Sequence, residues 1–398
     1  MGGGRAPRQS EGRLKLDGVR VLDLSRFLPG PWVGLTMADH GAEVIKIESP
    51  EGEPTRRLGP PVKGFPAYFR NTQRGKLSMT LNLKSEEGRE IFLKLAERSD
   101  VIIDSFRPGV MNRLGLGYET VRARAPRIVY CSLSAFGQTG PLAQRPSHDL
   151  GGQALTGVLS LGRIGGRAPS LPTLPMADIA LGSAALIAIL MALLKREKSG
   201  EGDNIDVAMI DTLMSWTPHI LSSVLHDDKA PDLAMERLHG GAAFYELYKT
   251  ADDQYIVLSG AEMNFVENLL NALGRPDLIE ICRASWGPAQ EAVKEFLSQT
   301  FATKTRDEWD RWLSDKSVCY APVLDMKEAW HSKVLRARGM IAAGADGVEN
   351  LATPIKFQEE PGEPSFECAT LGQHTDEILE RLGYDAAKRA ALHTAKVC

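Results

Sequence analysis

The residues best suited to chemistry stand at the starts of two apolar segments. Asp178 opens an apolar run that continues to about Leu194, and His148-Asp149 opens a second segment of small and apolar residues. Carboxylates and imidazoles are the groups of covalent and acid–base catalysis. The free N–H groups at the start of a helix favour an ionised carboxylate, so we expect Asp178 to be charged and oriented. The alternative is that Asp178 only caps its helix, since Asp is a preferred N-cap residue.

Composition narrows the classes of function. The chain has 398 residues and a net charge of -4, which gives no electrostatic case for binding nucleic acid or a membrane. Five scattered cysteines show no metal-ligand spacing and fit a reducing compartment. The Gly-rich N-terminus has no apolar core of a secretory signal. The apolar run 179–194 is shorter than a bilayer span, so we expect a buried helix in a cytoplasmic protein.

Strands and helices alternate through the first half of the chain. Short β-branched or apolar runs predict strands, and amphipathic spacing predicts helices between them. This alternation is typical of an α/β fold with a largely parallel sheet. The predicted strands are 19–24, 43–47, 78–83, 101–103 and 128–133, with one more starting at 203; the first helices are 33–39 and 85–98, and 51–76 is expected to be loop.

The pattern changes after residue 225. Aromatic-rich runs at 244–248 and 254–258 indicate a β-hairpin, and helices are expected at 265–273, 289–297 and 306–313. We therefore expect three segments: 14–225 as a large domain, 230–330 as a small α+β domain, and 331–398 returning to the large domain with a helix at 377–382.

The chain contains no GxGxxG, Walker A, HExxH or GxSxG motif. Several longer segments nevertheless resemble the class III CoA-transferase family, which also includes the α-methylacyl-CoA racemases. The resemblance runs from about Leu16 to about Leu382. The segments that carry it are LDGVRVLDLSRFLPGPW, ADHGAEVIKIESPEGEPTR, QRGKLSMTLNLKSEEGRE, DVIIDSFRPGVMNRLGLGYE, APRIVYCSLSAFGQTGP, MADIALG, KSGEGDNIDVAMID and LGQHTDEIL.

The resemblance implies a Rossmann-like large domain and an interlocked, ring-like homodimer. It implies CoA thioesters as substrates and a carboxylic acid as acceptor, with coenzyme A as a substrate moiety and no permanently bound cofactor or metal. Asp178 falls on the family's catalytic aspartate. In the transferases this residue forms a mixed anhydride and then an aspartyl-CoA thioester. Gly240-Gly241 falls on the transferases' mobile glycine loop.

The resemblance also implies contacts with CoA. Lys76, Phe106 and Arg113 fall on family positions that contact CoA, and Ser49 stands where several members have an arginine. Arg57 or Arg74 could take that arginine's place. From the residues alone, Lys76 could equally be a solvated turn charge, Phe106 a core residue and Arg113 a cation on a helix surface.

Two reactions fit the resemblance. His148 falls on the catalytic histidine of the racemases, and Glu262 falls on a glutamate that supports the aspartate there. Asp178 and His148 would then exchange protons at the substrate α-carbon, which suits a histidine near neutral pH. The surrounding sequence segments, such as ADIALG and NALGRPDL, resemble those of the transferases more than those of the racemases. We expect CoA transfer, with racemisation as the alternative and a CoA-binding scaffold without catalysis as a third possibility.

Overall fold

The computed structural model describes residues 14–162 and 169–398, so the Gly-rich N-terminal segment lies outside the described residues. The chain divides into two compact units. One consists of residues 1–216 with 333–398, and the other of residues 217–332. Residues 217–229, expected at the end of the large domain and in the linker after it, thus group with the second unit.

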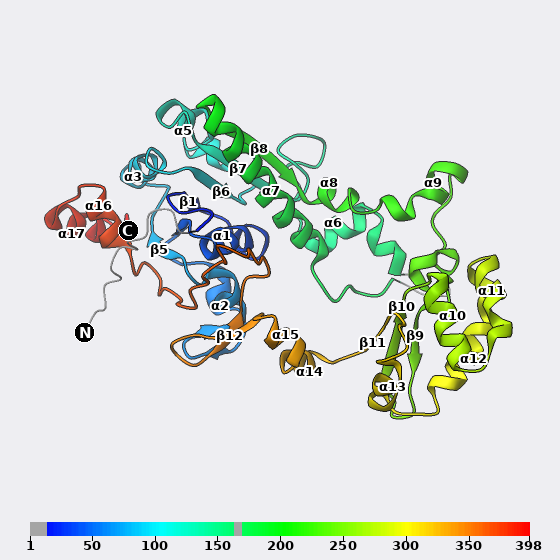
Figure 1. Cartoon of the computed structure of the whole chain (residues 1–398). Coiled ribbons are helices and arrows are strands. Elements are labelled where there is room, and N and C mark those ends of the chain that lie inside the picture. Colours follow the sequence, from blue (N-terminus) through cyan, green and yellow to red (C-terminus); the bar gives the residue numbers. More distant parts are fainter. Residues whose placement is uncertain (1–13, 163–168) are drawn as a thin grey trace. The chain divides into compact units, whose positions relative to one another are not determined.

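The first unit is built on a six-stranded parallel sheet with the order β5-β2-β1-β6-β7-β8 (Figure 1). Leu22 in the middle of β1 pairs with Ile45 of β2 on one side and with Ile102 of β6 on the other. The predicted strands are confirmed within a few residues. Their bounds are β1 Arg20–Asp23, β2 Glu43–Glu48, β5 Leu77–Thr80, β6 Val101–Asp104, β7 Val129–Ser134 and β8 Asp203–Ala208.

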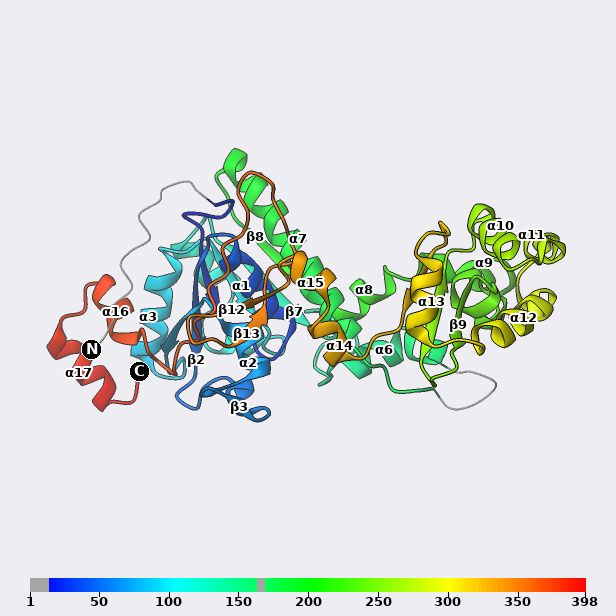
Figure 2. The ribbon, with the colours of Figure 1, turned by 60° about the horizontal axis from the view of Figure 1, so that its bottom comes forward.

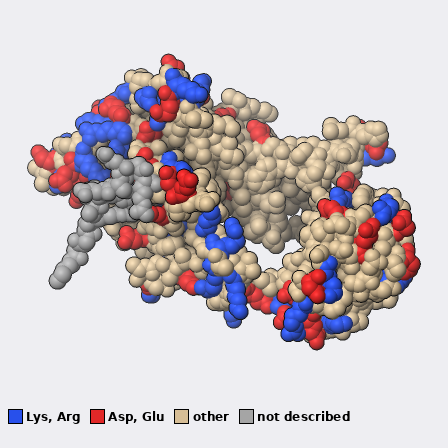
Figure 3. Space-filling view, viewed as in Figure 1, with Lys and Arg blue, Asp and Glu red and all other residues tan. Residues whose placement is uncertain are grey.

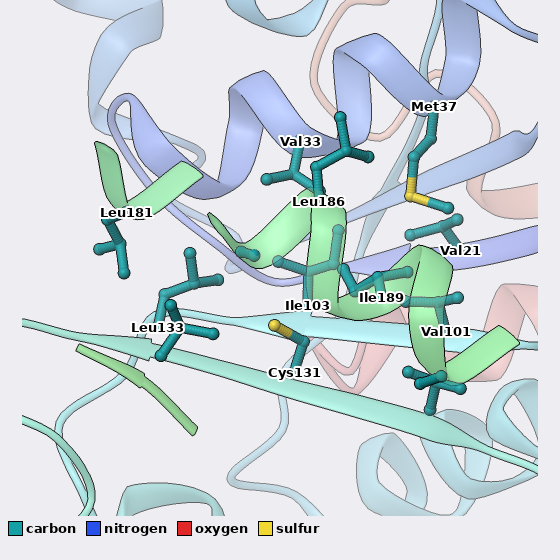
Figure 4. Close-up of a cluster of buried hydrophobic side chains, with 14 of the residues drawn as sticks. Val21, Val33, Met37, Val101, Ile103, Cys131, Leu133, Leu181, Leu186 and Ile189 are labelled. Atoms are coloured by element: carbon teal, nitrogen blue, oxygen red, sulfur yellow. The ribbon is translucent and has the colours of Figure 1, made fainter. Parts of the chain in front are cut away.

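Helices cover both faces of this sheet, and a hydrophobic core lies under each layer. One core joins the sheet to α1 (Pro29–Asp39) and α7 (Met176–Ser199) through residues such as Met37, Cys131 and Ile189 (Figure 4). The other core joins it to α3 (Glu86–Ala96), α5 (Tyr118–Arg124), α16 (Thr375–Arg381) and α17 (Ala386–Thr394). Figure 2 shows the two layers on either side of the strands. The C-terminal segment thus completes the first unit.

Helix α1 differs from the prediction at its N-terminus. Pro29-Gly30-Pro31 is expected to break the chain before residue 33, yet the helix begins at Pro29. The first turn of a helix tolerates proline because its N–H groups have no intrahelical acceptor. The helix passes close to α7: a Cβ on Gly182 of α7 would lie 2.9 Å from the Pro29 carbonyl oxygen. A glycine there permits the two helices to touch.

The predicted loop 51–76 also contains regular structure. It holds the hairpin β3 (Pro61–Val62) and β4 (Phe65–Pro66), followed by α2 (Ala67–Gln73). The remaining elements of the first unit are α4 Val110–Arg113, α6 Asp149–Leu155, α8 Met209–Met214, α15 Lys333–Ala337, β12 Ile341–Ala343 and β13 Glu349–Leu351.

The second unit contains the predicted hairpin within a three-stranded antiparallel sheet of order β11-β10-β9. Its core includes Tyr248 and Phe301, whose rings stack with centroids 5.2 Å apart. The buried Trp309 donates its indole N–H to the Phe301 carbonyl oxygen at 2.8 Å. The elements are β9 Tyr245–Lys249, β10 Tyr255–Ser259, β11 Tyr320–Pro322, α9 Ser222–Asp227, α10 Met263–Ala272, α11 Ile279–Ala284, α12 Glu291–Phe301, α13 Arg306–Leu313 and α14 Met326–Trp330.

Candidate active site

Asp178 lies in the first turn of α7, and a residue of another helix caps the N-terminus of α7. Pro175 occupies the N-cap position, where its side chain makes no capping hydrogen bond. Instead the Asp149 carboxylate, at the start of α6, accepts hydrogen bonds from the backbone N–H groups of Ala177 (2.7 Å) and Asp178 (3.1 Å). Its other oxygen accepts from the Gln153 amide at 2.7 Å. The N-cap interpretation of Asp178 is therefore wrong, because Asp149 performs that role.

The Asp178 carboxyl group is half-buried, and within residues 14–162 and 169–398 it accepts no hydrogen bond. Burial and, to a smaller extent, the negative charge of Asp149 together raise its pKa from 3.8 to about 7. The expectation that the Asp178 carboxyl is fully ionised needs correction. The N–H groups at the start of α7, whose dipoles would favour a negative charge on Asp178, already donate hydrogen bonds to Asp149. At pH 7 Asp178 exchanges freely between its protonated and ionised forms.

His148 reaches the same region from the N-cap position of α6. Its imidazole is exposed and meets the ring of Phe27 edge-on, with centroids 5.7 Å apart and planes at 89°. No described side chain or backbone group hydrogen-bonds to its nitrogens. Because the next residue, Asp149, binds the start of α7, His148 and Asp178 belong to adjoining helix ends. The structure therefore brings these two predicted residues into one neighbourhood.

Two further residues of this neighbourhood were not predicted. Phe27 has a backbone φ of 63° and donates its N–H to the buried Glu53 carboxylate at 3.0 Å. Tyr68 on α2 has a pKa raised to about 12, first by burial and then by the negative charges of Asp178 and Glu53. The phenol thus lies within electrostatic reach of Asp178, although the sequence shows only an aromatic residue in AYFRN.

A pocket of about 430 Å³ lies at the carboxyl ends of the central strands. Residues within two positions of the ends of β1, β2, β5 and β6 line it, including Leu24, Ser49, Leu81 and Phe106. The sheet order reverses between β1 and β6, and open α/β sheets bind ligands at such a switch point. The pocket is also lined by Arg26, Lys46, Glu51, Glu53 and Lys84.

The pocket combines apolar walls with a polar side that carries both cations and carboxylates. The Arg26 guanidinium lies over the Phe106 ring, 5.4 Å from its centroid. A hydrogen bond from Ser49 lowers the pKa of Glu51, and the charges of Lys84 and Arg26 lower it further. Such a site suits a flat aromatic group with phosphates, which need cations and hydrogen-bond donors. Arg26 and Lys84 were not singled out by sequence, since isolated cations are common on protein surfaces.

The predicted CoA contacts separate into two groups. Phe106 lines the pocket, whereas Arg113 is an exposed residue at the end of α4 that is not among its lining residues. Arg57 is exposed and donates to the Glu51 carbonyl oxygen beside the pocket. These three side chains can all reach solvent.

Lys76 and Arg74 are instead enclosed in the protein. The Lys76 ammonium donates to Asp23 (2.8 Å), to the Pro31 carbonyl (2.8 Å) and to Gln73 (3.0 Å), so its three donors are used. Burial lowers its pKa to about 8. Arg74 is 1% exposed and binds Asp39 through both terminal nitrogens, at 2.6 and 2.9 Å. Lys76 is therefore not a solvated turn charge, because both cations form buried ion pairs; their contact with CoA stays a prediction.

Glu262 and Gly240-Gly241 belong to the second unit. Glu262 lies 3.3 Å from the Arg237 guanidinium as an exposed ion pair. Gly240 has a φ of 91°, a conformation that favours glycine, and its carbonyl oxygen accepts a hydrogen bond from Lys294. The glycine pair thus lies in a turn that hydrogen-bonds within its own unit, and its mobility stays a prediction.

Two other features bear on the class of site. In the described part of the chain no three His, Cys, Asp or Glu side chains form a group that could hold a metal ion. Helix α7 is long and apolar enough to cross a membrane by length and composition, but one of its faces forms the core over the parallel sheet. It is a core helix of the first unit.

Comparison with known proteins places the chain in a family. The model of CoA-transferase family III matches residues 16–375. Human alpha-methylacyl-CoA racemase is 33% identical over 96% of this chain and 97% of its own length. Human succinyl-CoA:glutarate CoA-transferase is 32% identical over 96% and 91%. A crystal structure of a CAIB/BAIF family protein from Brucella suis superposes with a TM-score of 0.82 at 33% identity, covering 93% of this chain and all of that one.

The match spans both units and includes the helix that presents Asp178. Sequence and fold therefore agree over nearly the whole chain: it is an enzyme of CoA-transferase family III.

Proposed function

We propose that the chain transfers CoA from an acyl-CoA thioester to a free carboxylic acid, with Asp178 as the nucleophile. The observation that carries this proposal is the Asp178 carboxyl group itself, which accepts no hydrogen bond from the described residues and has a pKa of about 7. A carboxylate is a better nucleophile when its pKa is high, provided that part of it is ionised at working pH. Both conditions hold for Asp178 near neutral pH.

In the proposed reaction an Asp178 oxygen attacks the thioester carbonyl, and the carbon–sulfur bond breaks to release CoA thiolate. The mixed anhydride is then attacked by that thiolate at the Asp178 carbonyl carbon, which releases the acyl carboxylate. The resulting aspartyl-CoA thioester reacts with the acceptor carboxylate by the reverse route. Each step exchanges one acyl bond for another, so exclusion of water preserves the activated group.

The loop between β1 and α1 connects the pocket with the start of α7, which supports an orientation for the bound CoA thioester. Leu24 and Arg26 line the pocket, while Phe27, the next residue, meets His148 beside the start of α7. A CoA nucleotide in the pocket, with its adenine against Phe106 and its phosphates near Arg26 and Lys84, would send the pantetheine arm along this loop. The thioester would then arrive at Asp178.

The proposal is tested with the wild-type protein and Asp178→Asn. Wild-type protein incubated with isotope-labelled CoA thioesters and a panel of free carboxylic acids is expected to form new CoA thioesters, measured by mass spectrometry. Asp178→Asn is expected to form none, because an amide cannot act as the nucleophile. Transfer that persists in Asp178→Asn, or no transfer with any acid, would refute the proposal.

A second candidate reaction is racemisation of a 2-methylacyl-CoA, which the pairing of His148 with Asp178 favours. One proton-exchanging group on each of two adjoining helix ends can remove and return a proton at a carbon between them. A pKa of about 7 at Asp178 suits that role too. The human racemase that matches this chain is as similar to it as the transferases are.

Solvent exchange separates the two reactions. A racemase is expected to exchange the α-hydrogen of a 2-methylacyl-CoA with deuterium from D₂O, and His148→Asn is expected to stop that exchange. A transferase is expected to move CoA without such exchange. Deuterium incorporation that is unchanged in His148→Asn would remove racemisation as a candidate.

We further propose that the chain forms the interlocked homodimer implied by the family. The outer face of α7 carries an exposed apolar stripe, and charged residues are sparse on the surface over α7 and α8 (Figure 3). Exposed apolar surface of this kind is typical of an interface. Light scattering tests it: a mass of one chain in solution would refute the dimer. The stripe consists of Ile179, Ile187, Leu190, Met191 and Leu194.

A further inference from the structure

Phe27 has a backbone conformation that costs free energy. Its φ of 63° lies in the left-handed region, which bulky side chains rarely adopt. A glycine at this position would adopt the same conformation without that cost. The chain carries phenylalanine there instead, so we look for a role of the aromatic ring that this backbone conformation positions.

A buried carboxylate holds this conformation. The Phe27 N–H donates to Glu53 Oε1 at 3.0 Å, and the Thr55 hydroxyl donates to the same oxygen at 3.1 Å. Glu53 is only 3% exposed. Its own backbone N–H donates to Glu48, which is paired with Arg56 at 2.6 Å. Glu53 is thus fixed by its surroundings and can impose a position on the Phe27 backbone.

The conformation brings the Phe27 ring against His148. The two rings meet edge-on at 5.7 Å. Edge-to-face packing is a favoured and directional arrangement of aromatic rings. Within the described residues no hydrogen bond fixes the imidazole nitrogens of His148, and Phe27 is the aromatic ring that packs against the imidazole.

We propose that Phe27 and Glu53 are positioning residues for His148 in the reaction at Asp178. Glu53 holds the Phe27 backbone, and the Phe27 ring packs against the imidazole. This proposal rests on the proposed function only in taking His148 to act on the bound thioester. It adds two residues whose proposed role is to orient His148.

The test combines nuclear magnetic resonance with kinetics. The Cε1–Hε1 signal of His148, assigned among eight histidines by its loss in His148→Asn, reports the ring environment. In Phe27→Leu this signal is expected to move, because the aromatic ring beside the imidazole is gone. In the same variant kcat is expected to fall about tenfold with KM for the thioester unchanged, since orientation and not binding is lost. Turnover is measured in whichever of the two assays above the wild type performs.

The chain offers a matched control. Phe357 is 40% exposed and packs edge-on against His40 at 5.4 Å, much as the 38% exposed Phe27 packs against His148. Phe357→Leu is expected to move the signal of His40, to leave that of His148 in place, and to keep wild-type kcat. Phe27→Gly, which relieves the backbone strain, guards against misfolding: it is expected to fold and still to lose kcat. Glu53→Gln, which keeps an acceptor oxygen for Phe27, is expected to lose less kcat than Glu53→Ala.

The outcomes that overturn the proposal are distinct from failure of the proposed function. An unmoved His148 signal in Phe27→Leu would overturn it, and so would a moved signal with unchanged kcat. An equal fall of kcat in Phe357→Leu would also overturn it. Absence of any wild-type turnover would refute the proposed function, and the His148 signal alone would then decide whether Phe27 positions the imidazole.

Discussion

Replacing Asp149 with Asn isolates the charge that acts on the candidate nucleophile. Asn keeps a carbonyl oxygen that can accept the N–H groups of Ala177 and Asp178, so the start of α7 stays capped. It removes the negative charge, together with the acceptor oxygen that the Gln153 amide uses. Because that charge is one of the two causes that raise the pKa of Asp178, we expect the pKa of Asp178 to fall below about 7 in Asp149→Asn.

The size of the fall follows from the geometry. An oxygen of Asp149 lies 3.1 Å from the backbone nitrogen of Asp178, which sets the two carboxylates roughly 6 Å apart on standard bond dimensions. Two unit charges at that separation repel by about 3 kcal/mol at an effective dielectric constant of about 20, an upper figure for groups that solvent can reach. We therefore expect the pKa of Asp178 to fall by about 1 to 2 pH units. Burial, the larger cause, still holds it above 3.8.

The assay is the pH dependence of kcat/KM, whose acidic limb reports ionisation of the free enzyme. The wild-type limb is expected near pH 7, and the limb of Asp149→Asn about 1 to 2 pH units lower. Asp203→Asn, which removes an exposed carboxylate at the start of β8, serves as the charge control and should keep the wild-type limb. A limb that stays in place or moves upward in Asp149→Asn would refute this electrostatic reasoning.

Three further changes test the structure. Asp178→Asn should raise the melting temperature at pH 8 more than at pH 5. A carboxyl whose pKa rises from 3.8 to about 7 on folding stabilises the fold when it is protonated, and this contribution is lost as the pH rises through 7. Calorimetry showing the opposite trend would contradict this prediction. Arg74→Met should cost about 3 to 5 kcal/mol in urea unfolding, since it leaves the buried Asp39 unpaired; a cost below about 1 kcal/mol would mean that the pair is dispensable. Gly182→Ala should destabilise by about 1 to 3 kcal/mol, because its Cβ would press on Pro29 of α1; a more stable variant would show that the helices can move apart.

The parallel sheet could be predicted because its strands are short apolar runs that are local in sequence. The start of α1 could not, because a proline is compatible both with a break and with a first helical turn. Helix α2 was missed for a different reason. Its sequence, AYFRNTQ, has weak helical spacing, and its buried residues Phe69 and Arg70 find their partners in tertiary contacts: Arg70 pairs with Asp346, 276 positions away.

In the site, too, the residues could be predicted from local sequence, whereas their charge states depend on residues distant in sequence. Asp178 and His148 stand out locally, but the charge state of Asp178 depends on Asp149, which is 29 positions away in sequence. The expectation from helix dipoles was reversed because burial and that second carboxylate outweigh them. Lys76 resembles a ligand-binding cation in sequence, whereas its partner Asp23 is 53 positions away and makes it a buried ion pair. Phe27 is conspicuous only through its backbone dihedral angle, which no residue pattern reveals.

The most direct test of covalent catalysis at Asp178 is trapping the intermediate. Wild-type protein is incubated with an acyl-CoA and hydroxylamine, digested, and the peptide containing Asp178 is sequenced by mass spectrometry. Asp178 is expected to carry a hydroxamate, which appears only with acyl-CoA and is absent from Asp178→Asn. CoA transfer by wild-type protein with an unmodified Asp178, or with the hydroxamate on another residue, would contradict the account.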